Sequence, residues 1–204
     1  MKIAVLGTGK IGGTLGRAFA RAGHDVTFGS RDAGGETRAA GDGEPGVSDI
    51  PSAIGAADVV VLAVPGPAVA GLVREHAPAL GGKLIVDAAN KVGESGPANS
   101  HDTVTAMAPA VRYARAFNSL GFENLQNPRY GDVVGDMFFS CPEPDRATLE
   151  QLITAVGLRP VYLGDGAHAL LDDVLRLWFT LSRRTGQRHF AFKVVGDAVP
   201  PDPH

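Results

Sequence analysis

Cysteine is almost missing from this sequence: Cys141 is the single cysteine among 204 residues. One cysteine excludes an intrachain disulfide and any metal site built from several cysteines. The six histidines lack the spacing of metal ligands, so we expect no metal. Because Cys141 follows the apolar pair Phe138–Phe139, we expect its thiol to be a small, buried core group.

The sequence is also poor in aromatic residues, and it lacks long apolar runs and a large excess of one charge. The formal net charge is −3, and aromatic residues make up 6% of the chain. No basic stretch carries interleaved aromatics, which argues against a nucleic-acid partner. No apolar run approaches the roughly 20 residues that cross a membrane, and Met1 leads directly into a strand pattern, leaving no room for a signal peptide. We therefore expect a soluble, cytoplasmic protein with small-molecule partners.

Several common catalytic patterns are absent too. No tyrosine precedes a lysine by four residues, which excludes the catalytic pair of short-chain dehydrogenases, and no G-x-S-x-G occurs. No long second helical domain follows the predicted strands, which argues against a β-hydroxyacid dehydrogenase. His101 is the only histidine near a predicted strand-end loop. It is a weak candidate for a proton donor, and a loop or helix-capping role is the alternative.

What the sequence does contain starts at its N-terminus. Lys2–Leu6 is a short apolar run rich in strand-forming residues, and Gly7-Thr8-Gly9-Lys10-Ile11-Gly12 follows it as G-x-G-x-x-G. The first glycine permits a tight turn, the second lets a pyrophosphate approach the backbone, and the third lets the next helix pack closely. Helical spacing of apolar residues continues to about Ala22, and the N-terminus of such a helix favours bound phosphate. The pattern predicts a dinucleotide site.

The end of the second predicted strand, Asp25–Phe28, decides which dinucleotide fits. In an NAD site an acidic residue here bonds the ribose hydroxyls. Ser30 stands in that place and Arg31 follows it. A hydroxyl can donate to a 2′-phosphate, and an arginine can hold it with two parallel bonds. We therefore predict NADP(H). The alternative is a plain polar turn in which Asp32 is a displaced ribose ligand.

Strand and helix patterns alternate along most of the remaining chain. The expected strands are Asp58–Val64, Lys83–Asp87, Val111–Phe117, Met137–Cys141 and Arg159–Leu163. This alternation predicts an α/β fold of the Rossmann type, a doubly wound and mostly parallel sheet. We assign residues 1–163 to this NADP-binding domain. An amphipathic helix of about five turns begins near Ala167, and we assign residues 164–204 to a small C-terminal helical extension packed on the same domain.

The residues that follow the strands are the next candidates for the site. Ligands of doubly wound sheets lie beyond the carboxyl ends of the strands. We therefore expect Ala63, Val64 and Pro65 to face the cofactor through backbone and small side chains. Asn90 either orients the nicotinamide or a substrate, or simply forms an Asx turn. Asn118 also points to the ligand side, and Phe122–Tyr130 is a predicted loop that could cover the site.

The chain resembles the family of NADP oxidoreductases that depend on the deazaflavin coenzyme F-420. The resemblance rests on four segments: GTGKIGGTLGRAFARAGHDVTFGSRD, DVVVLAVP, RAFNSLGFENLQNP and RLWFTLSRRTGQRHFAFKVV. It implies a compact Rossmann domain with a small C-terminal extension, pairing as dimers, and direct hydride transfer between nicotinamide and deazaflavin. Carried over by this resemblance, Thr8, Lys10 and Ile11 lie on the pyrophosphate and Ser30 and Arg31 on the 2′-phosphate. Val64, Pro65, Asn90 and Asn118 then fall around the nicotinamide.

Three functions follow from these patterns. The first is hydride transfer between NADP(H) and a deazaflavin of the F-420 type, which needs positioning more than acid–base chemistry. The second is an NADPH-dependent reductase of a small imine or unsaturated metabolite, with His101, Tyr130 and Asp173 as weak candidates for the proton donor. The third is a redox sensor that binds NADP(H) without turnover. We also expect a homodimer in which the C-terminal helix around Trp178 is partly covered by the other subunit.

Overall fold

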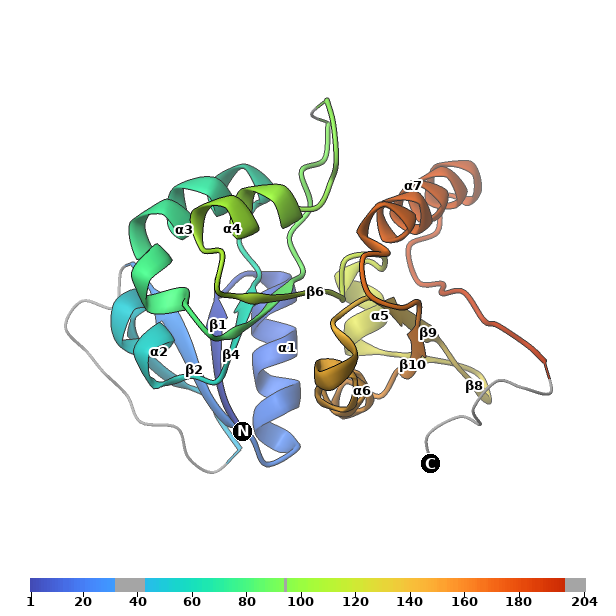
Figure 1. The fold of residues 1–204 in the computed structure, drawn as a ribbon. Helices are drawn as coiled ribbons and strands as arrows, with labels where there is room; N and C mark the ends of the chain where they lie inside the picture. Colours follow the sequence, from blue (N-terminus) through green and yellow to red (C-terminus); the bar gives the residue numbers. More distant parts are fainter. Residues whose placement is uncertain (32–42, 94, 197–204) are drawn as a thin grey trace.

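The computed structural model describes residues 1–31, 43–93 and 95–196. Figure 1 shows two neighbouring parts, a sheet with its covering helices and a second part that holds α5 to α7 and β8 to β10. The strands are β1 (Lys2–Leu6), β2 (Asp25–Ser30), β3 (Gly46–Asp49), β4 (Val59–Leu62), β5 (Leu84–Asp87), β6 (Arg112–Arg115), β7 (Arg129–Tyr130), β8 (Val133–Val134), β9 (Asp136–Phe139) and β10 (Arg159–Tyr162). The helices are α1 (Lys10–Arg21), α2 (Ile50–Ala56), α3 (Gly66–Leu80), α4 (His101–Met107), α5 (Phe122–Gln126), α6 (Arg146–Ala155) and α7 (His168–Thr185).

The main sheet has six strands in the order β3-β2-β1-β4-β5-β6. Every neighbouring pair in it is parallel. This is the strand order of a doubly wound dinucleotide-binding fold, in which the order reverses beside β1. The predicted Rossmann-type α/β fold is therefore confirmed.

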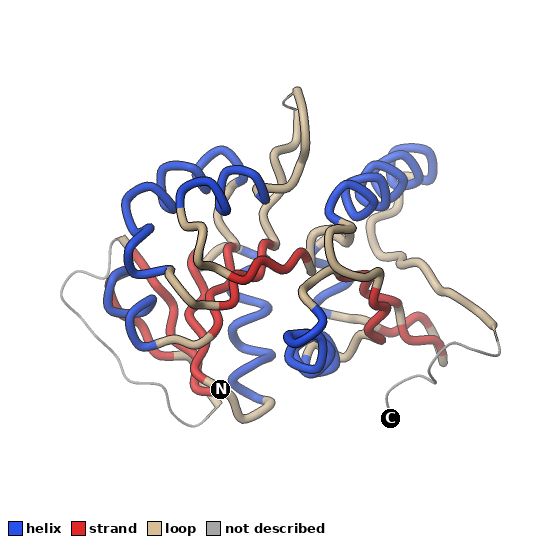
Figure 2. The backbone as a smooth tube through the Cα atoms, viewed as in Figure 1, coloured by secondary structure: helices blue, strands red, loops and turns tan. Residues whose placement is uncertain are grey.

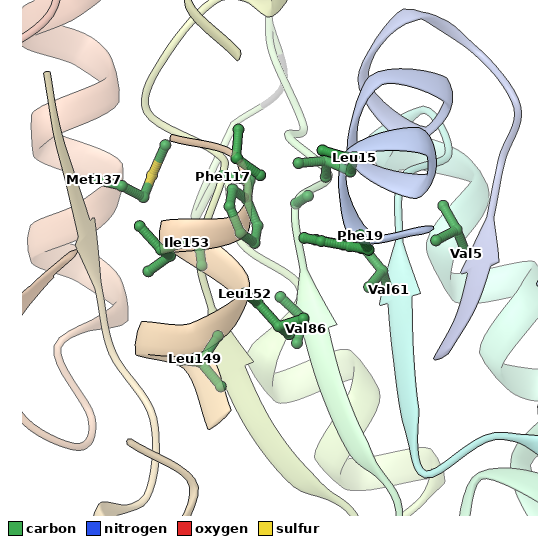
Figure 3. Close-up of a cluster of buried hydrophobic side chains, with 14 of the residues drawn as sticks. Val5, Leu15, Phe19, Val61, Val86, Phe117, Met137, Leu149, Leu152 and Ile153 are labelled. Atoms are coloured by element: carbon green, nitrogen blue, oxygen red, sulfur yellow. The ribbon is translucent and has the colours of Figure 1, made fainter. Parts of the chain in front are cut away.

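Helices cover both faces of this sheet (Figure 2). Alternate residues of one strand enter opposite cores: Ile3 and Val5 pack with α1 and α6, whereas Ala4 and Leu6 pack with α2, α3 and α4. Strands buried on both faces carry continuous apolar runs, which explains why all four residues of β4 are buried. Figure 3 shows Phe117 between α1 and α6, and its ring lies edge-on to Phe19 at 6.0 Å.

Strands β9 and β10 were expected from their apolar patterns, but they do not extend the main sheet. They pair in parallel with each other in a separate two-stranded sheet, with α6 as the crossover. Parallel strands require such a crossover connection. A single antiparallel bridge, between Arg115 and Ser140, links the end of β9 to β6. The alternating pattern therefore identified these elements without showing which strands they pair with.

The prediction of a loop at Phe122–Tyr130 is wrong. Phe122–Gln126 forms α5, and Arg129–Tyr130 pairs with β8. The segment is held by contacts distant in sequence: the side chain of Asn124 donates to the carbonyl of Arg188 at 2.8 Å and accepts from Tyr130 Oη at 2.6 Å. Helical periodicity is not detectable over five residues, nor strand alternation over two.

The C-terminal helix α7 buries one face and exposes the other. Trp178 is only 1% exposed, stacks on Phe190 at 5.3 Å and donates its indole N–H to the carbonyl of that residue. The chain's own C-terminal segment thus covers Trp178, and no second subunit is needed for it. Leu170 and Leu177 lie on the opposite side and are 52% and 50% exposed. No helix in the described part of the chain is long and apolar enough to cross a membrane.

Candidate functional site

The glycine-rich turn between β1 and α1 shows three different environments. Gly7 has φ +110°, and a Cβ there would lie 2.6 Å from the carbonyl oxygen of Ala63. A Cβ on Gly12 would lie 1.9 Å from the carbonyl oxygen of Gly7. A Cβ on Gly9 would meet nothing within 4 Å. Gly7 and Gly12 are therefore required by the turn itself, whereas Gly9 faces open space where a ligand can approach the backbone.

The N-terminus of α1 faces the same open space. Gly9 is the N-cap residue and no side chain caps the helix. The first amides of a helix have no intrahelical partner and carry the positive end of its dipole, which favours phosphate. The Lys10 side chain is turned to α5, with its ammonium 4.4 Å from the Phe122 ring centroid. Lys10 and Ile11 are thus placed to offer backbone amides, and Ile11 packs its side chain against the core.

A cavity of about 570 Å³ opens at this point, within the size range of small-molecule sites. Its walls include eight of the predicted residues: Gly7, Thr8, Gly9, Ser30, Arg31, Ala63, Val64 and Pro65. The opposite wall is α3, through Ala68, Gly71, Leu72, Glu75 and His76. No sequence pattern marked α3 as part of the site. Its helical pattern was visible, but which of its faces would meet the carboxyl end of β2 depends on the tertiary arrangement.

Ser30 and Arg31 stand at the carboxyl end of β2, in the cavity wall. Ser30 is half-buried and Arg31 exposed. Within the described residues, Arg31 makes no hydrogen bond or ion pair, so its guanidinium can meet a phosphate. Asp32, the alternative ribose ligand, lies outside the described residues.

Asn90 and Asn118 lie together, but they are not in the wall of this cavity. Asn90 Nδ2 donates to the carbonyl of Asn118 at 2.9 Å, and Asn90 Oδ1 accepts from Arg115 Nη2 at 2.7 Å. Gly66 packs against the backbone of Asn90, where a Cβ would lie 2.4 Å from its carbonyl oxygen. The Asn90 amide therefore holds strand ends together. These contacts reach residues distant in sequence, unlike those of the Asx turn that was the alternative to cofactor contact.

His101 lies in a different place. It lines a second cavity of about 550 Å³ together with Asn99, Asp165 and His168, and none of its lining residues belongs to the first cavity. Its Nδ1 lies 2.9 Å from Asp102 Oδ1, and its ring stacks on His168 at 4.5 Å. Burial and the neighbouring His101 lower the pKa of His168. A proton-donor role for His101 remains a prediction.

The other two proton-donor candidates also have partners. Tyr130 donates its hydroxyl to Asn124, and burial raises the pKa of its phenol. Asp173 lies on the outer face of α7 in an ion pair with Arg176. Cys141 is fully buried, as predicted, and burial raises the pKa of its thiol to about 12. Among the described residues, no three or more histidine, cysteine or acidic side chains are grouped to hold a metal ion.

The residues of the first cavity fit NADP(H). The open approach over Gly9 and the uncapped helix N-terminus suit a pyrophosphate, and the cation at Arg31 suits a further phosphate.

Comparison with known proteins agrees with this geometry. Residues 2–91 match the model of a family described as NADP oxidoreductase, coenzyme F-420-dependent. A solved protein from Arthrobacter sp. FB24, described as a candidate F-420-dependent NADP reductase, superposes with a TM-score of 0.81 at 25% identity. The match covers 96% of this chain and 100% of that one. No protein among those with curated descriptions matches.

Two further solved structures share the fold. A hypothetical protein from Sinorhizobium meliloti has a TM-score of 0.64 at 26% identity, covering 82% of this chain and 87% of its own. A reductive aminase from Aspergillus terreus, in complex with NADPH and ethyl levulinate, has a TM-score of 0.65 at 22% identity. It matches 91% of this chain, but this chain spans only 62% of its length.

The family match covers β1 to the end of β5, which is the part that builds the cavity. It confirms the predicted cofactor, NADP(H), and the predicted class of enzyme. Residues 2–91 are thus similar to the coenzyme F-420-dependent NADP oxidoreductases, and the protein is an NADP-dependent oxidoreductase.

Proposed function

We propose that this enzyme transfers a hydride between NADP(H) and a deazaflavin of the F-420 type. The observation that carries the proposal is the likeness to the Arthrobacter protein, which extends over the full length of that chain. It includes α5 to α7, the elements beyond the family-model match. The shared architecture therefore covers both the cofactor cavity and the elements beside it.

We assign the cofactor to the first cavity. The nicotinamide of NADP(H) supplies or takes the hydride when bound, and the chain's residues hold it in place. The amides at Gly9 to Ile11 receive the pyrophosphate, Ser30 and Arg31 the 2′-phosphate, and α3 lies beside the adenosine end. Ala63, Val64 and Pro65 lead from there to the ends of β5 and β6, where we place the nicotinamide, near Asn90 and Asn118.

The arrangement of the proton-donor candidates supports transfer between two ring systems. His101 lines the other cavity, Tyr130 bonds to Asn124, and Asp173 pairs with Arg176 at the surface. Hydride transfer between flat heterocycles depends mainly on close approach and alignment of the donor and acceptor carbons, and the proton that accompanies the hydride can come from solvent. The residues that the sequence offered for proton transfer thus already serve other contacts.

Reduction of a small imine is the second candidate. It is favoured by the likeness in fold to the reductive aminase, which covers 91% of this chain. That enzyme is much longer, however, and the part absent here is more than a third of its length. A substrate pocket built from that part would have no counterpart in this chain, so we place this function second and a non-catalytic redox sensor third.

We further propose that the protein is a homodimer paired through α7. Leu170, Val174, Leu177 and Leu181 follow one another at spacings of four, three and four residues, which makes one stripe on the outer face of the helix. Arg184 continues the stripe toward the C-terminus, and the exposed Asp165 precedes the helix. In an antiparallel pair the stripe meets its own copy, and the arginine of one helix end faces the aspartate of the other. This self-complementarity supports a second copy of the chain as the partner of the stripe.

One assay separates the three functions. Oxidation of NADPH is followed with an oxidised F-420-type deazaflavin and, in parallel, with a panel of cyclic imines. We expect turnover with the deazaflavin, and His101→Ala and Tyr130→Phe each to retain turnover within about tenfold, because loss of a true general acid costs about 10²–10⁴-fold. Turnover with an imine alone would establish the reductase. NADPH binding without turnover of any acceptor would favour the third function, a non-catalytic redox sensor.

A further inference from the structure

A cluster of three buried charged side chains lies at the carboxyl ends of β5 and β6. Arg115 and Asp87 are both 0% exposed and Asp172 is 2% exposed. Arg115 Nη1 lies 3.2 Å from Asp87 Oδ2, and Arg115 Nη2 lies 3.1 Å from Asp172 Oδ1. Buried charges of this kind persist only where they are paired and hydrogen-bonded. None of the three residues belongs to a motif that the sequence alone reveals.

The guanidinium of Arg115 holds the end of β5 at several points. Nη1 donates to the carbonyl of Asp87 at 3.3 Å and to the carbonyl of Ala89. Nη2 donates to Asn90 Oδ1 at 2.7 Å, and the same Asn90 amide donates to the carbonyl of Asn118 at the end of β6. One cation therefore fixes the path of the chain at the two strand ends where we place the nicotinamide.

The other side of the cluster belongs to α7. Asp172 accepts from the backbone N–H groups of Ala98 and Asn99, at 2.8 and 3.1 Å, and from Asn99 Nδ2 at 2.8 Å. Asp87 is held in turn by the Tyr113 hydroxyl at 2.6 Å. The C-terminal helix is thus joined to the loop after β5 and, through Arg115, to the strand ends.

The backbone beside the cluster is strained. Phe117 has φ 60°, a left-handed conformation that is unfavourable for a bulky residue, and it is the only such non-glycine residue in the described chain. It directly precedes Asn118 and is fully buried. Such conformations persist only when the surroundings fix them, and they cluster at functional sites. The strain lies at the strand end that Asn90 and Arg115 hold.

We infer that Arg115 and Asp172 are positioning residues for the nicotinamide end of the cofactor. They touch neither cofactor nor substrate, and they act by fixing Ala89, Asn90 and Asn118. This inference rests on the proposed placement of the nicotinamide at these strand ends. It assigns α7 a role in the site although the helix contributes nothing to the cavity that holds the phosphates.

A second buried pair provides a matched control. Arg159 and Asp136 are 5% and 0% exposed, and Arg159 Nε donates to Asp136 Oδ1 at 2.7 Å. This pair holds β9, β10 and the C-terminal segment at Val194. Like the Arg115 cluster it joins a buried arginine to a buried aspartate, but it lies at β9 and β10, away from the ends of β5 and β6. Asp136→Asn thus measures what the loss of any buried carboxylate does to the protein.

The experiment compares Asp172→Asn with Asp136→Asn. For each variant we would measure the unfolding midpoint, the affinity for adenosine 2′,5′-bisphosphate, which lacks the nicotinamide, and the affinity and nicotinamide fluorescence of bound NADPH. For Asp172→Asn we expect bisphosphate affinity to change less than twofold, while NADPH emission shifts and kcat with the deazaflavin falls at least tenfold. For Asp136→Asn we expect a lower unfolding midpoint with unchanged emission.

Two results would overturn the inference. One is an Asp172→Asn protein whose NADPH emission and kcat match those of the wild type. The other is a loss of affinity for adenosine 2′,5′-bisphosphate and for NADPH that is equal in Asp172→Asn and Asp136→Asn. If Asp172→Asn does not fold, Asn99→Ala removes one donor to the same carboxylate and should shift the emission in the same direction, by less. The fluorescence emission of bound NADPH is measured without any hydride acceptor. Failure of the deazaflavin assay alone would therefore reject the proposed function and leave the positioning test intact.

Discussion

Arg31 is the residue that we expect to select between the two dinucleotides. It is exposed at the carboxyl end of β2 and lines the cofactor cavity. We expect NADPH to bind at least tenfold more tightly than NADH. Arg31→Ala should weaken NADPH binding by about 1.5–3 kcal/mol, the range for hydrogen bonds to charged groups, with little change for NADH. Titration of both cofactors against both proteins measures this, and an equal loss for the two would make Arg31 structural.

Gly9 and Gly12 belong to one motif, yet we expect substitution of Gly9 to abolish NADPH binding and substitution of Gly12 to lower stability. An added Cβ at Gly9 meets nothing within 4 Å, so Gly9→Val should fold with a nearly unchanged unfolding midpoint but lose NADPH binding. At Gly12 the Cβ would lie 1.9 Å from the Gly7 carbonyl oxygen, so even Gly12→Ala should lower the unfolding midpoint. Thermal unfolding and cofactor titration of both variants test the pair. A stable, NADPH-binding Gly9→Val would reject the placement of the pyrophosphate.

We expect His168 to make the stability of the folded protein depend on pH. Burial, and then the neighbouring His101, lower the pKa of His168 below its ordinary value of 6.5. As the pH falls through that value the unfolded chain takes up a proton that the folded chain resists, so stability decreases from neutral toward acidic pH. Asp165 and Asp172 oppose the shift, and Arg115 adds to it. Tyr113 packs edge-on against the imidazole at 5.0 Å.

We expect His168→Gln to lower the unfolding midpoint at every pH but to reduce its decrease between pH 7.5 and pH 5.5. Part of the decrease should remain, because burial also lowers the pKa of His24. Thermal unfolding of the two proteins across this range provides the measurement. Parallel curves for variant and wild type would show that His168 does not contribute.

At the residue scale, the residues predicted to bind phosphate come together in the walls of one cavity, whereas Asn90 and Asn118, predicted near the nicotinamide, lie outside those walls. Gly7, Gly9 and Ser30 belong to local patterns whose geometry is fixed by neighbours in the chain. Arg115 and Asp172 stand 57 residues apart and meet only in the folded protein. A buried arginine within the strand pattern of β6 is the one signal that could have drawn attention to them, because arginine is rarely buried without a partner.

At the scale of elements, long segments with clear periodicity were predictable and short ones were not. The helix expected after the glycines is α1, and the five-turn helix expected from about Ala167 is α7. The short helix α5 and strands β3, β7 and β8 were missed, since two to five residues carry too little pattern. Strand pairing was also invisible for β9 and β10. Their apolar residues fit a main sheet and a separate two-stranded sheet equally well.

The short element α5 has a position that matters for the site. It contacts α1, and the Phe122 ring lies under the Lys10 ammonium. Glu123 pairs with Arg188, whose guanidinium lies 5.2 Å from the Trp178 ring. The residues of α5 thus link the phosphate-binding helix to α7 and the C-terminal segment. An element too short to predict thus connects the two parts of the molecule beside the N-terminus of α1.

At the scale of the whole molecule, the apolar stripe on α7 predicts the oligomeric state; Leu170 and Leu177 in it are exposed, and Val174 and Leu181 are half-buried. Exposed apolar residues scattered singly are ordinary, but a contiguous row at a heptad-like spacing is typical of a helix that packs against another. The wild-type protein should be a dimer at micromolar concentration by light scattering. Leu177→Arg places a charge in the middle of the stripe, where it would meet its own copy in an antiparallel pair, so we expect a monomer.

The matched control is Val133→Arg, which introduces the same charge at another exposed apolar residue, 45% exposed and on β8. It should leave the dimer intact. A dimeric Leu177→Arg, or a monomeric wild type, would contradict pairing through α7.

Asp172 projects from the buried face of the same helix into the Arg115 cluster. A monomeric Leu177→Arg therefore also tests whether pairing through α7 stabilises the ends of β5 and β6. If it does, the monomer should show the altered NADPH emission expected of Asp172→Asn, with its affinity for adenosine 2′,5′-bisphosphate unchanged.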